Sequence, residues 1–233
     1  MGDRIGIRVI GVDACRGGWV AVCLPVGPGK PWIAVEVAPS LRDLLAPLLA
    51  PDDSTVVGID MPLGLLGTGW RAADRAARGL LGPRRSSVFA IPPRPVWEQA
   101  SYAEANRRCR ELTGQGFSAQ AWGLRVKLLE ADAYRGTCRH PIYEVHPELA
   151  FGAMAGAPLA ASKHTAPGRA DRIRVLAEAG IEIPGSAPVS VLGDMLDAAA
   201  VAWSARRIAA GQAVVVPGEP QLDDRGREIT VRF

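Results

Sequence analysis

The chain has 233 residues, with 27 Lys and Arg against 24 Asp and Glu, so its formal net charge is only +3. That excess is too small to indicate nucleic-acid binding by itself, and no run approaches the roughly 20 apolar residues that a membrane span needs. The first residues lack the charged, apolar and cleavage regions of a signal peptide, and the four cysteines form no C-x-x-C pair typical of zinc or redox motifs. We therefore expect a cytoplasmic protein with free thiols and no membrane segment.

The first 60 residues predict three strands, a helix and a fourth strand. The first three strands are Ile7–Val12, Trp19–Leu24 and Trp32–Val37. Their short glycine and proline turns are typical of an antiparallel meander. Ser40 provides an N-cap for a short helix, Leu41–Leu49, which Pro51 and Asp52 close. Thr55–Ile59 is a compact apolar run of the kind that is buried on both faces of a sheet, and this order of elements predicts the opening of a ribonuclease H-like sheet.

Helices dominate the rest of the chain. Between residues 63 and 139 the strands disappear, so we predict one domain, residues 1–233, with a helical insertion at about 63–139. A strand at Pro141–Val145 returns to the sheet, and Val191–Ala210 is the most regular helix, with an apolar stripe. The other predicted elements are helices at Trp70–Leu81, Trp97–Leu112, Phe117–Tyr134, Glu148–Met154 and Arg169–Ala179, and a hairpin of Val214–Val216 with Glu228–Phe233. The predicted fold class is α/β, with a mixed sheet (a three-strand meander, then parallel strands) flanked by helices.

Four aspartates are candidate metal ligands. Asp13 ends the first strand before a glycine turn, and alone it would more often only cap that turn. Asp60 ends a strand expected near the sheet centre, where open α/β sheets place ligands; a structural salt bridge is the alternative. Asp194 and Asp197 project from nearly one face of the last helix, although Asp194 could merely complement the helix dipole. Neighbouring carboxylates repel unless a cation lies between them, so the four together predict an oxygen-ligand site for Mg²⁺ or Mn²⁺.

The segment Tyr143–Glu148, YEVHPE, provides two further catalytic candidates. In a strand, Glu144 and His146 would share one face. Glu144 could then assist catalysis, and His146 could orient a water, ligate metal or contact a substrate phosphate. The alternative for His146 is a helix cap before Pro147.

Five basic residues are candidates for contacts with substrate phosphates, because guanidinium and ammonium groups bind such anions. Arg16 lies in the first glycine turn, and Arg84 and Arg85 lie in a proline-rich loop. Lys163 and Arg169 belong, with Arg172, to a looser group around the start of the predicted helix Arg169–Ala179. A solvated surface face is the alternative for these charges.

Six motifs together resemble a known family. They are GVDACRGGWV, GIDMPLGL, DRAARGLLGPRRSSVF, YEVHPELAF, SKHTAPGRADR and GDMLDAAAVAWSA. In this order, along nearly the whole chain, they resemble the domain of unknown function 429 family, described as predicted nucleases of the RNase H fold. The resemblance implies that fold and a nuclease activity.

The layout of the acids is also similar to that of Holliday-junction resolvases of the same superfamily. Those enzymes place one acid on the first strand, one at the end of the fourth and a D-x-x-D pair on the last helix, and Asp13, Asp60, Asp194 and Asp197 match these places. The long segment between Asp60 and Asp194 departs from that pattern, so the resemblance leaves the substrate open.

The leading hypothesis from the sequence is a metal-dependent nuclease that hydrolyses phosphodiester bonds in RNA or DNA. Two divalent ions about 3.5–4 Å apart, held by the four aspartates, would activate water and stabilise the leaving oxygen. One alternative is a phosphotransferase of the actin-like or sugar-kinase type with Asp60 as base, although the sequence lacks a second copy of the first hairpin. Another is a non-catalytic binding module of the same fold.

Overall fold

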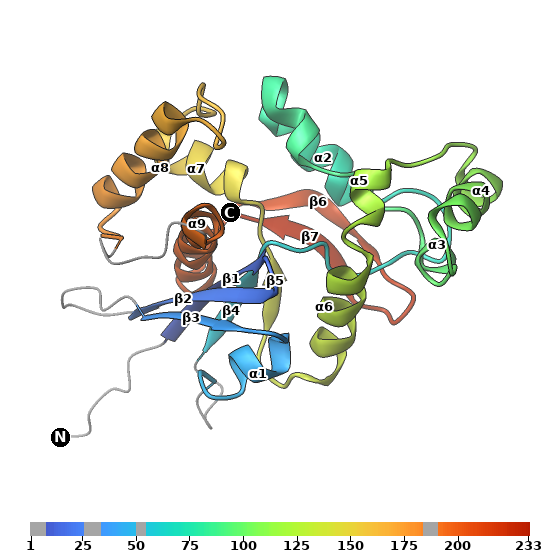
Figure 1. Cartoon of the computed structure of the whole chain (residues 1–233), viewed down its shortest axis with the longest axis horizontal. Helices are drawn as coiled ribbons and strands as arrows, with labels where there is room; N and C mark the ends of the chain where they lie inside the picture. The colour runs from blue at the N-terminus through green and yellow to red at the C-terminus, as the bar shows by residue number, and fades with distance from the viewer. Residues whose placement is uncertain (1–7, 26–33, 50–54, 184–190) are drawn as a thin grey trace. The chain divides into compact units, whose positions relative to one another are not determined.

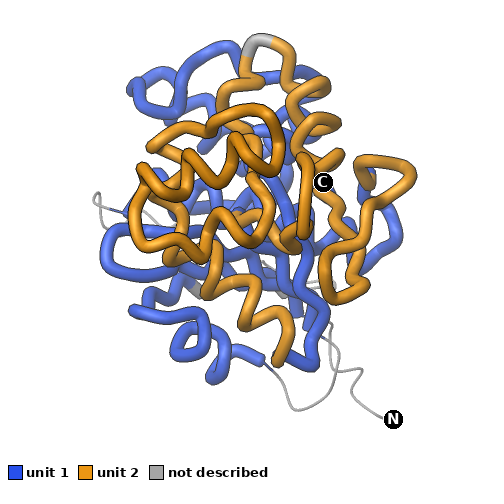
Figure 2. Tube along the Cα trace, turned by 90° about the vertical axis from the view of Figure 1, so that its right-hand side faces the viewer, with its two compact units in different colours: residues 1–60, 138–214, 232–233 blue, residues 61–137, 215–231 orange. Residues whose placement is uncertain are grey.

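The computed structural model describes residues 8–25, 34–49, 55–183 and 191–233. Within it the chain forms two compact units (Figure 2). Unit 1 comprises Met1–Asp60, Cys138–Val214 and Arg232–Phe233, and unit 2 comprises Met61–Thr137 and Val215–Val231. One domain with a helical insertion stays a prediction. The expected strand starts at Ile7 and Trp32, and the helix end at Pro51 and Asp52, lie outside the described residues.

Unit 1 is built on a five-stranded mixed sheet (Figure 1). Its strands are β1 (Arg8–Cys15), β2 (Gly18–Pro25), β3 (Ala34–Ala38), β4 (Val56–Ile59) and β5 (Ile142–Glu144). Their order is β3-β2-β1-β4-β5. The first three strands are antiparallel neighbours, whereas β4 runs parallel to both β1 and β5. The predicted mixed sheet of a meander followed by parallel strands is therefore confirmed.

The first hairpin is longer than its sequence pattern indicated. β1 continues past Val12 to Cys15, and Asp13 lies inside it, paired with Val20 of β2. The turn itself is Arg16 and Gly17, and Gly17 has the positive φ of 86° that favours glycine. Asp13 is therefore a residue of the central strand and lies three positions before Arg16, outside the turn that the alternative interpretation had it cap.

Four helices belong to unit 1: α1 (Leu41–Leu45), α7 (Pro147–Ala155), α8 (Ala166–Glu178) and α9 (Leu192–Ala209). α9 packs on β1, β2 and β4, and α7 and α8 pack on α9, whereas α1 contacts β2 and β3 from the opposite face of the sheet (Figure 1). The side chains between α9 and the sheet form a continuous apolar core that includes Val9, Val22, Phe151 and Leu196. Among the described helices, none combines the length and apolar character needed to cross a membrane.

Two glycines allow α9 to lie unusually close to the sheet. A Cβ atom on Gly11 of β1 would lie 2.1 Å from both the carbonyl oxygen of Ala198 and the amide nitrogen of Ala202. A Cβ atom on Gly58, which pairs with Gly11, would lie 2.9 Å from the side chain of Val201. Small residues on both surfaces therefore bring the helix backbone against the two central strands.

Unit 2 consists of short helices and a two-stranded hairpin. Its helices are α2 (Ala72–Leu81), the 3₁₀ helix η1 (Gly82–Ser87), α3 (Arg94–Trp97), α4 (Tyr102–Thr113), α5 (Ala119–Trp122) and α6 (Arg125–Thr137). Its hairpin is β6 (Val215–Leu222) with β7, whose full span is Glu228–Arg232. The helix predicted at Trp97–Leu112 is two helices, because Ser101 and Glu104 form a capping box that starts α4. The segment predicted at Phe117–Tyr134 is likewise divided into α5 and α6.

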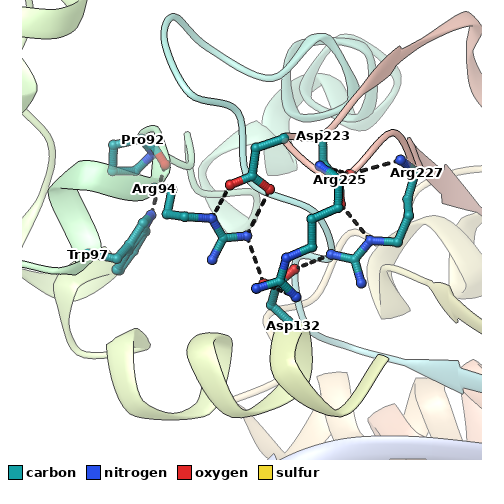
Figure 3. A network of polar contacts seen from close by, with 8 residues as sticks. Pro92, Arg94, Trp97, Asp132, Asp223, Arg225 and Arg227 are labelled. Carbon is teal, nitrogen blue, oxygen red and sulfur yellow. Dashed lines mark hydrogen bonds and ion pairs between the residues drawn. The ribbon is translucent and has the colours of Figure 1, made fainter. Parts of the chain in front are cut away.

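An ion-pair network joins the helices of unit 2 to the hairpin turn (Figure 3). Asp132 on α6 accepts hydrogen bonds from Arg94 at 2.8 Å and from Arg227 at 2.8 Å. Arg94 also pairs with Asp224, and Arg227 donates to Asp223 at 2.7 Å. The Asp132 side chain is only 2 % exposed, so its charge is stabilised by these guanidinium groups and not by water.

Candidate metal centre

The strand register places two aspartates side by side in unit 1. Val12 of β1 pairs with Ile59 of β4, and the amide of Asp60 donates to the carbonyl of Val12 at 2.8 Å. Asp13 and Asp60 therefore each follow one member of this pair, at the carboxyl ends of adjacent parallel strands. Because side chains alternate along a strand, Asp13 is on the α9 side with Gly11, and Asp60 is on that side with Gly58.

α9 adds a third carboxylate. Asp197 precedes Ala198 and lies one turn before Val201, the residues that touch the two strand glycines. Asp13, Asp60 and Asp197 each offer a carboxylate oxygen, and these oxygens all lie within 4.8 Å of one another. Asp13 and Asp197 are 7 % and 2 % exposed and Asp60 is half-buried, so the three acids form a mostly desolvated cluster.

Asp194 is the predicted ligand that the structure does not bring into this group. It lies one turn before Ala198 in the first turn of α9 and is half-buried. Burial and then the charge of Asp197 raise its pKa, and its own charge contributes to the raised pKa of Asp13. Asp194 is therefore an electrostatic neighbour of the three clustered aspartates.

The cluster has an excess of negative charge. Burial, followed by the charge of Asp197, raises the pKa of Asp60 to about 8. Burial followed by the charges of Asp60 and Asp197 raises the pKa of Asp13 well above its ordinary value. Both shifts have the cause expected for carboxylates crowded away from water. A bound cation would remove that repulsion, and oxygen-only donors suit a hard divalent ion.

Lys163 supplies one positive charge to the cluster. Its Nζ lies 2.7 Å from Oδ2 of Asp197, and its side chain is 44 % exposed. Burial alone would lower the pKa of Lys163, but the attraction of Asp197, Asp60 and Asp13 outweighs it and raises that pKa above its ordinary value. Lys163 was predicted only as a substrate contact; the structure makes it a partner of the acids as well.

Close packing holds the loop that carries Lys163. The hydroxyl of Thr165 caps α8 by accepting from the amide of Gly168 at 3.1 Å. A Cβ atom on Gly168 would lie 1.9 Å from the carbonyl oxygen of Ser162, so only glycine permits this contact. The buried Arg172 donates to the carbonyl of Ala161 at 3.3 Å. These contacts fix both sides of Lys163.

The acids and the histidine of YEVHPE have different structural roles. Glu144 ends β5, is buried and pairs with Ile59, and its charge contributes to the raised pKa of Asp60. His146 is the N-cap residue of α7, and its carbonyl accepts from the amide of Ala150. Glu148 also acts on the pKa of Asp60 and forms an ion pair with Arg172. Glu148 is not among the site residues predicted from the sequence, because nothing local in the sequence shows that Arg172 reaches it.

The remaining predicted basic residues are spread over both units. Arg16 is exposed in the β1–β2 turn, and Arg169 on α8 donates to the carbonyl of His164 at 3.1 Å. Arg84 and Arg85 lie in η1 and belong to unit 2. Of the five predicted substrate contacts, Lys163 is the one that has a hydrogen bond to a clustered acid in the described part of the chain.

Comparison with known proteins places the chain in a family. The family described as "Protein of unknown function (DUF429)" matches residues 11–222, which include every clustered acid and Lys163. The chain belongs to the DUF429 family. No curated protein and no solved structure matches this DUF429 chain. The family description assigns no activity, so the chemistry of the DUF429 protein has to be argued from its own residues.

Proposed function

We propose that the protein is a divalent-metal-dependent nuclease of RNase H-like fold that hydrolyses phosphodiester bonds in nucleic acid. The observation that carries the proposal is the convergence of Asp13, Asp60 and Asp197 from β1, β4 and α9. The strand order β3-β2-β1-β4-β5 supports an RNase H-like arrangement, because β1 lies at the centre with the parallel strand β4 beside it.

Asp13, Asp60 and Asp197 would hold the ion. Carboxylate oxygens are the ligands that Mg²⁺ and Mn²⁺ prefer. After burial, the charges of Asp60 and Asp197 are the next causes of the raised pKa of Asp13, so the three acids repel one another. When bound, such an ion supplies a water of lowered pKa and stabilises negative charge on phosphate oxygens. Glu144 and Glu148 lie beside Asp60 and add to the negative potential that attracts a cation.

Charge balance favours one ion in the cluster. The three carboxylates carry three negative charges when ionised, and Lys163 returns one positive charge. The remaining charge of these four groups, −2, would be balanced by a single divalent cation. Binding of two ions by all four aspartates stays a prediction from the sequence. Asp194 lies outside the group of Asp13, Asp60 and Asp197, and this position supports a site for a single ion.

Lys163 has a second role in this proposal. Its ammonium fixes Asp197 through a charge-assisted hydrogen bond. Because 44 % of its side chain is exposed, it can also donate to a phosphate oxygen that approaches from solvent. Lys163 would thus hold the metal ligand Asp197 in place and would also orient a substrate phosphate beside the acid cluster.

The test combines metal binding with cleavage. Purified protein is titrated with Mn²⁺ by calorimetry and then offered end-labelled RNA, DNA, hybrid and junction substrates with Mg²⁺ or Mn²⁺. We expect about one ion per chain, and we expect Asp60→Asn to lower both the affinity for Mn²⁺ and the cleavage rate by at least ~100-fold, the scale of a lost electrostatic contact to a reacting group. Glu178→Gln, an exposed acid on α8, is the matched control and should leave both unchanged.

Three results would contradict the proposal: no Mn²⁺ binding, no cleavage of any substrate, or cleavage that survives Asp60→Asn. Binding of Mn²⁺ together with an ATP-induced rise in melting temperature and no cleavage would favour the phosphotransferase. Among the described residues the five-stranded sheet occurs once, whereas that class normally uses two related domains, so we place it second.

A further inference from the structure

Unit 2 contains a cavity of about 900 Å³ bordered by α2, by η1 with the loop after it, and by the loop between α4 and α5. This volume is within the range of about 300–1,000 Å³ that small-molecule sites occupy. Four of the lining residues are arginines, Arg71, Arg75, Arg78 and Arg85, whereas Asp74 is the one acid in the lining. The cavity is therefore strongly basic.

The acid in the wall is already neutralised. Oδ1 of Asp74 lies 3.3 Å from Nε of Arg71, and Oδ2 of Asp74 accepts from the amide of Ile91 at 2.8 Å. Both charged side chains are almost fully buried, at 5 % and 1 % exposure, so Arg71 and Asp74 form a structural pair in the wall. The positive charge that faces a ligand comes from the other three arginines.

Arg75, Arg78 and Arg85 form an uncompensated basic surface. Arg75 and Arg78 are three residues apart on α2, so they project from one side of the helix, and Arg85 comes from η1. Arg75 and Arg85 are exposed and Arg78 is half-buried. None of the three forms an ion pair with another described residue. Their guanidinium groups are therefore available to an anion.

Two aromatic side chains in the lining, Trp70 and Phe89, have no aromatic or cationic partner among the described residues. Trp70 and Phe89 are half-buried, and neither makes a ring contact within the described part of the chain. Phe117, which also lines the cavity, differs because it packs edge-on against Trp97 with ring centroids 5.7 Å apart. Phe117 is thus part of the packed wall, whereas Trp70 and Phe89 are half-buried lining residues whose rings are not used in ring packing.

The α4–α5 side of the cavity is held in place by hydrogen bonds. Tyr102 donates through its hydroxyl to the carbonyl of Phe117 at 2.7 Å, and the amide of Phe117 donates to Oδ1 of Asn106 at 3.2 Å. A Cβ atom on Gly116 would lie 2.4 Å from the same oxygen, so the loop lies directly on the Asn106 side chain. A wall that is already ordered reduces the entropy lost when a ligand binds.

We propose that this cavity binds a nucleotide, with the phosphate held by Arg75, Arg78 and Arg85 and the base stacked on Trp70 or Phe89. Arginine forks match phosphate oxygens in charge and geometry, and base stacking on an aromatic ring contributes about 1–3 kcal/mol per base. The nucleotide is either free or part of a single strand, since both offer the same phosphate and base. This site is separate from the proposed nuclease chemistry, because neither contact needs a divalent ion.

The experiment measures binding to the full chain in EDTA, where metal-dependent cleavage does not occur. Calorimetry compares AMP, adenosine, inorganic phosphate and a single-stranded hexa-adenylate. We expect AMP to bind at least about tenfold more tightly than adenosine, and the Arg75→Ala, Arg78→Ala double variant to weaken AMP binding by about tenfold or more. Trp70→Leu or Phe89→Leu, whichever ring the base stacks on, should weaken binding of AMP but not of inorganic phosphate. Arg107→Ala, an exposed arginine of α4 outside the lining, is the matched control and should change neither.

The proposal is overturned if neither AMP nor hexa-adenylate binds, or if Arg107→Ala weakens binding as much as the double variant. Tighter binding of hexa-adenylate than of AMP supports a strand as the source of the nucleotide, and equal binding supports the free nucleotide. Arg85→Ala, on η1, provides a second variant if the double variant does not fold. Since no divalent ion is present, failure here leaves the nuclease proposal untouched, and failure of cleavage leaves this one untouched.

Discussion

The pKa of Asp60 is raised by the charges of several neighbouring acids. Asp60 receives negative potential from Asp197, Glu144 and Glu148, and the charge of Lys163 offsets only part of it. Burial is the largest single cause of its raised pKa, which reaches about 8. Without a cation, Asp60 therefore holds its proton through the neutral pH range, and a cation must displace that proton in order to bind.

This proton predicts how stability depends on pH. The ordinary pKa of Asp60, 3.8, applies to the unfolded chain, and its pKa in the folded chain is about 8. Between these values the folded state binds more protons than the unfolded state, so this residue makes the free energy of unfolding fall as pH rises. In EDTA we expect the melting temperature to decrease from about pH 5 to about pH 8, and Mn²⁺ to raise it more at the upper end.

Asp60→Asn should reduce that slope, because asparagine does not titrate, although Asp13 retains a contribution of the same sign. Glu178→Gln on the surface of α8 should keep the slope of the wild type. Scanning calorimetry at a series of pH values measures this. A slope in Asp60→Asn equal to that of the wild type would show that the pKa of Asp60 is not raised.

At the scale of elements, the contact between α9 and the sheet positions the acids. Asp197 reaches Asp13 and Asp60 because the backbone of α9 touches Gly11 and Gly58. The small alanine side chains around Asp197 also allow this close approach, since Ala198, Ala199 and Ala202 are all fully buried. Larger side chains at these positions would lift the helix and separate the carboxylates.

Gly11→Ala tests that dependence. The added Cβ would lie 2.1 Å from backbone atoms of Ala198 and Ala202, which only a shift of α9 can relieve. We expect a loss of about 3 kcal/mol in the free energy of unfolding and weaker Mn²⁺ binding, measured by urea denaturation and calorimetry. Gly193→Ala in the first turn of α9 is the matched control, since a Cβ atom on Gly193 would meet nothing within 4 Å, and it should be neutral or slightly stabilising. Equal effects of the two substitutions would show that the close approach is unimportant.

At the scale of the whole molecule, the two units are stabilised by different interactions. Unit 1 has a continuous apolar core between the sheet and α9. Unit 2 has short helices and a single hairpin, and a buried carboxylate, Asp132, ties α3 and α6 to the hairpin turn through Arg94 and Arg227 (Figure 3). We therefore expect this ion-pair network to contribute more to the stability of unit 2 than an exposed ion pair usually contributes to a protein.

Asp132→Asn should destabilise unit 2. Removing the carboxylate charge leaves Arg94 and Arg227 with one partner fewer in a site where Asp132 is only 2 % exposed, which costs about 3 kcal/mol. Hydrogen exchange should show faster exchange of the amides of α6 and of the β6–β7 turn. Glu111→Gln removes an exposed pair with Arg108 and should change stability by less than about 0.5 kcal/mol. Unchanged exchange in Asp132→Asn would exclude a stabilising role for the network.

The sequence by itself determined the alternation of elements in unit 1. Three β-rich runs separated by short glycine and proline turns predicted the meander, and the apolar run before Asp60 predicted the buried strand β4, because these are local properties of the chain. The i, i+3 spacing on a helix also placed Asp194 and Asp197 near one face. Helix boundaries in unit 2 were less predictable, since the capping box at Ser101 interrupts an otherwise helical pattern.

Only the tertiary structure decided which of the candidate residues meet. It brings Asp197 but not Asp194 into the group with Asp13 and Asp60, because α9 approaches the sheet where Gly11 and Gly58 permit it. It also pairs Asp197 with Lys163, 34 residues away, through a loop whose position depends on packing against α8. Such pairings depend on the close approach of segments far apart in the chain, which no local pattern encodes.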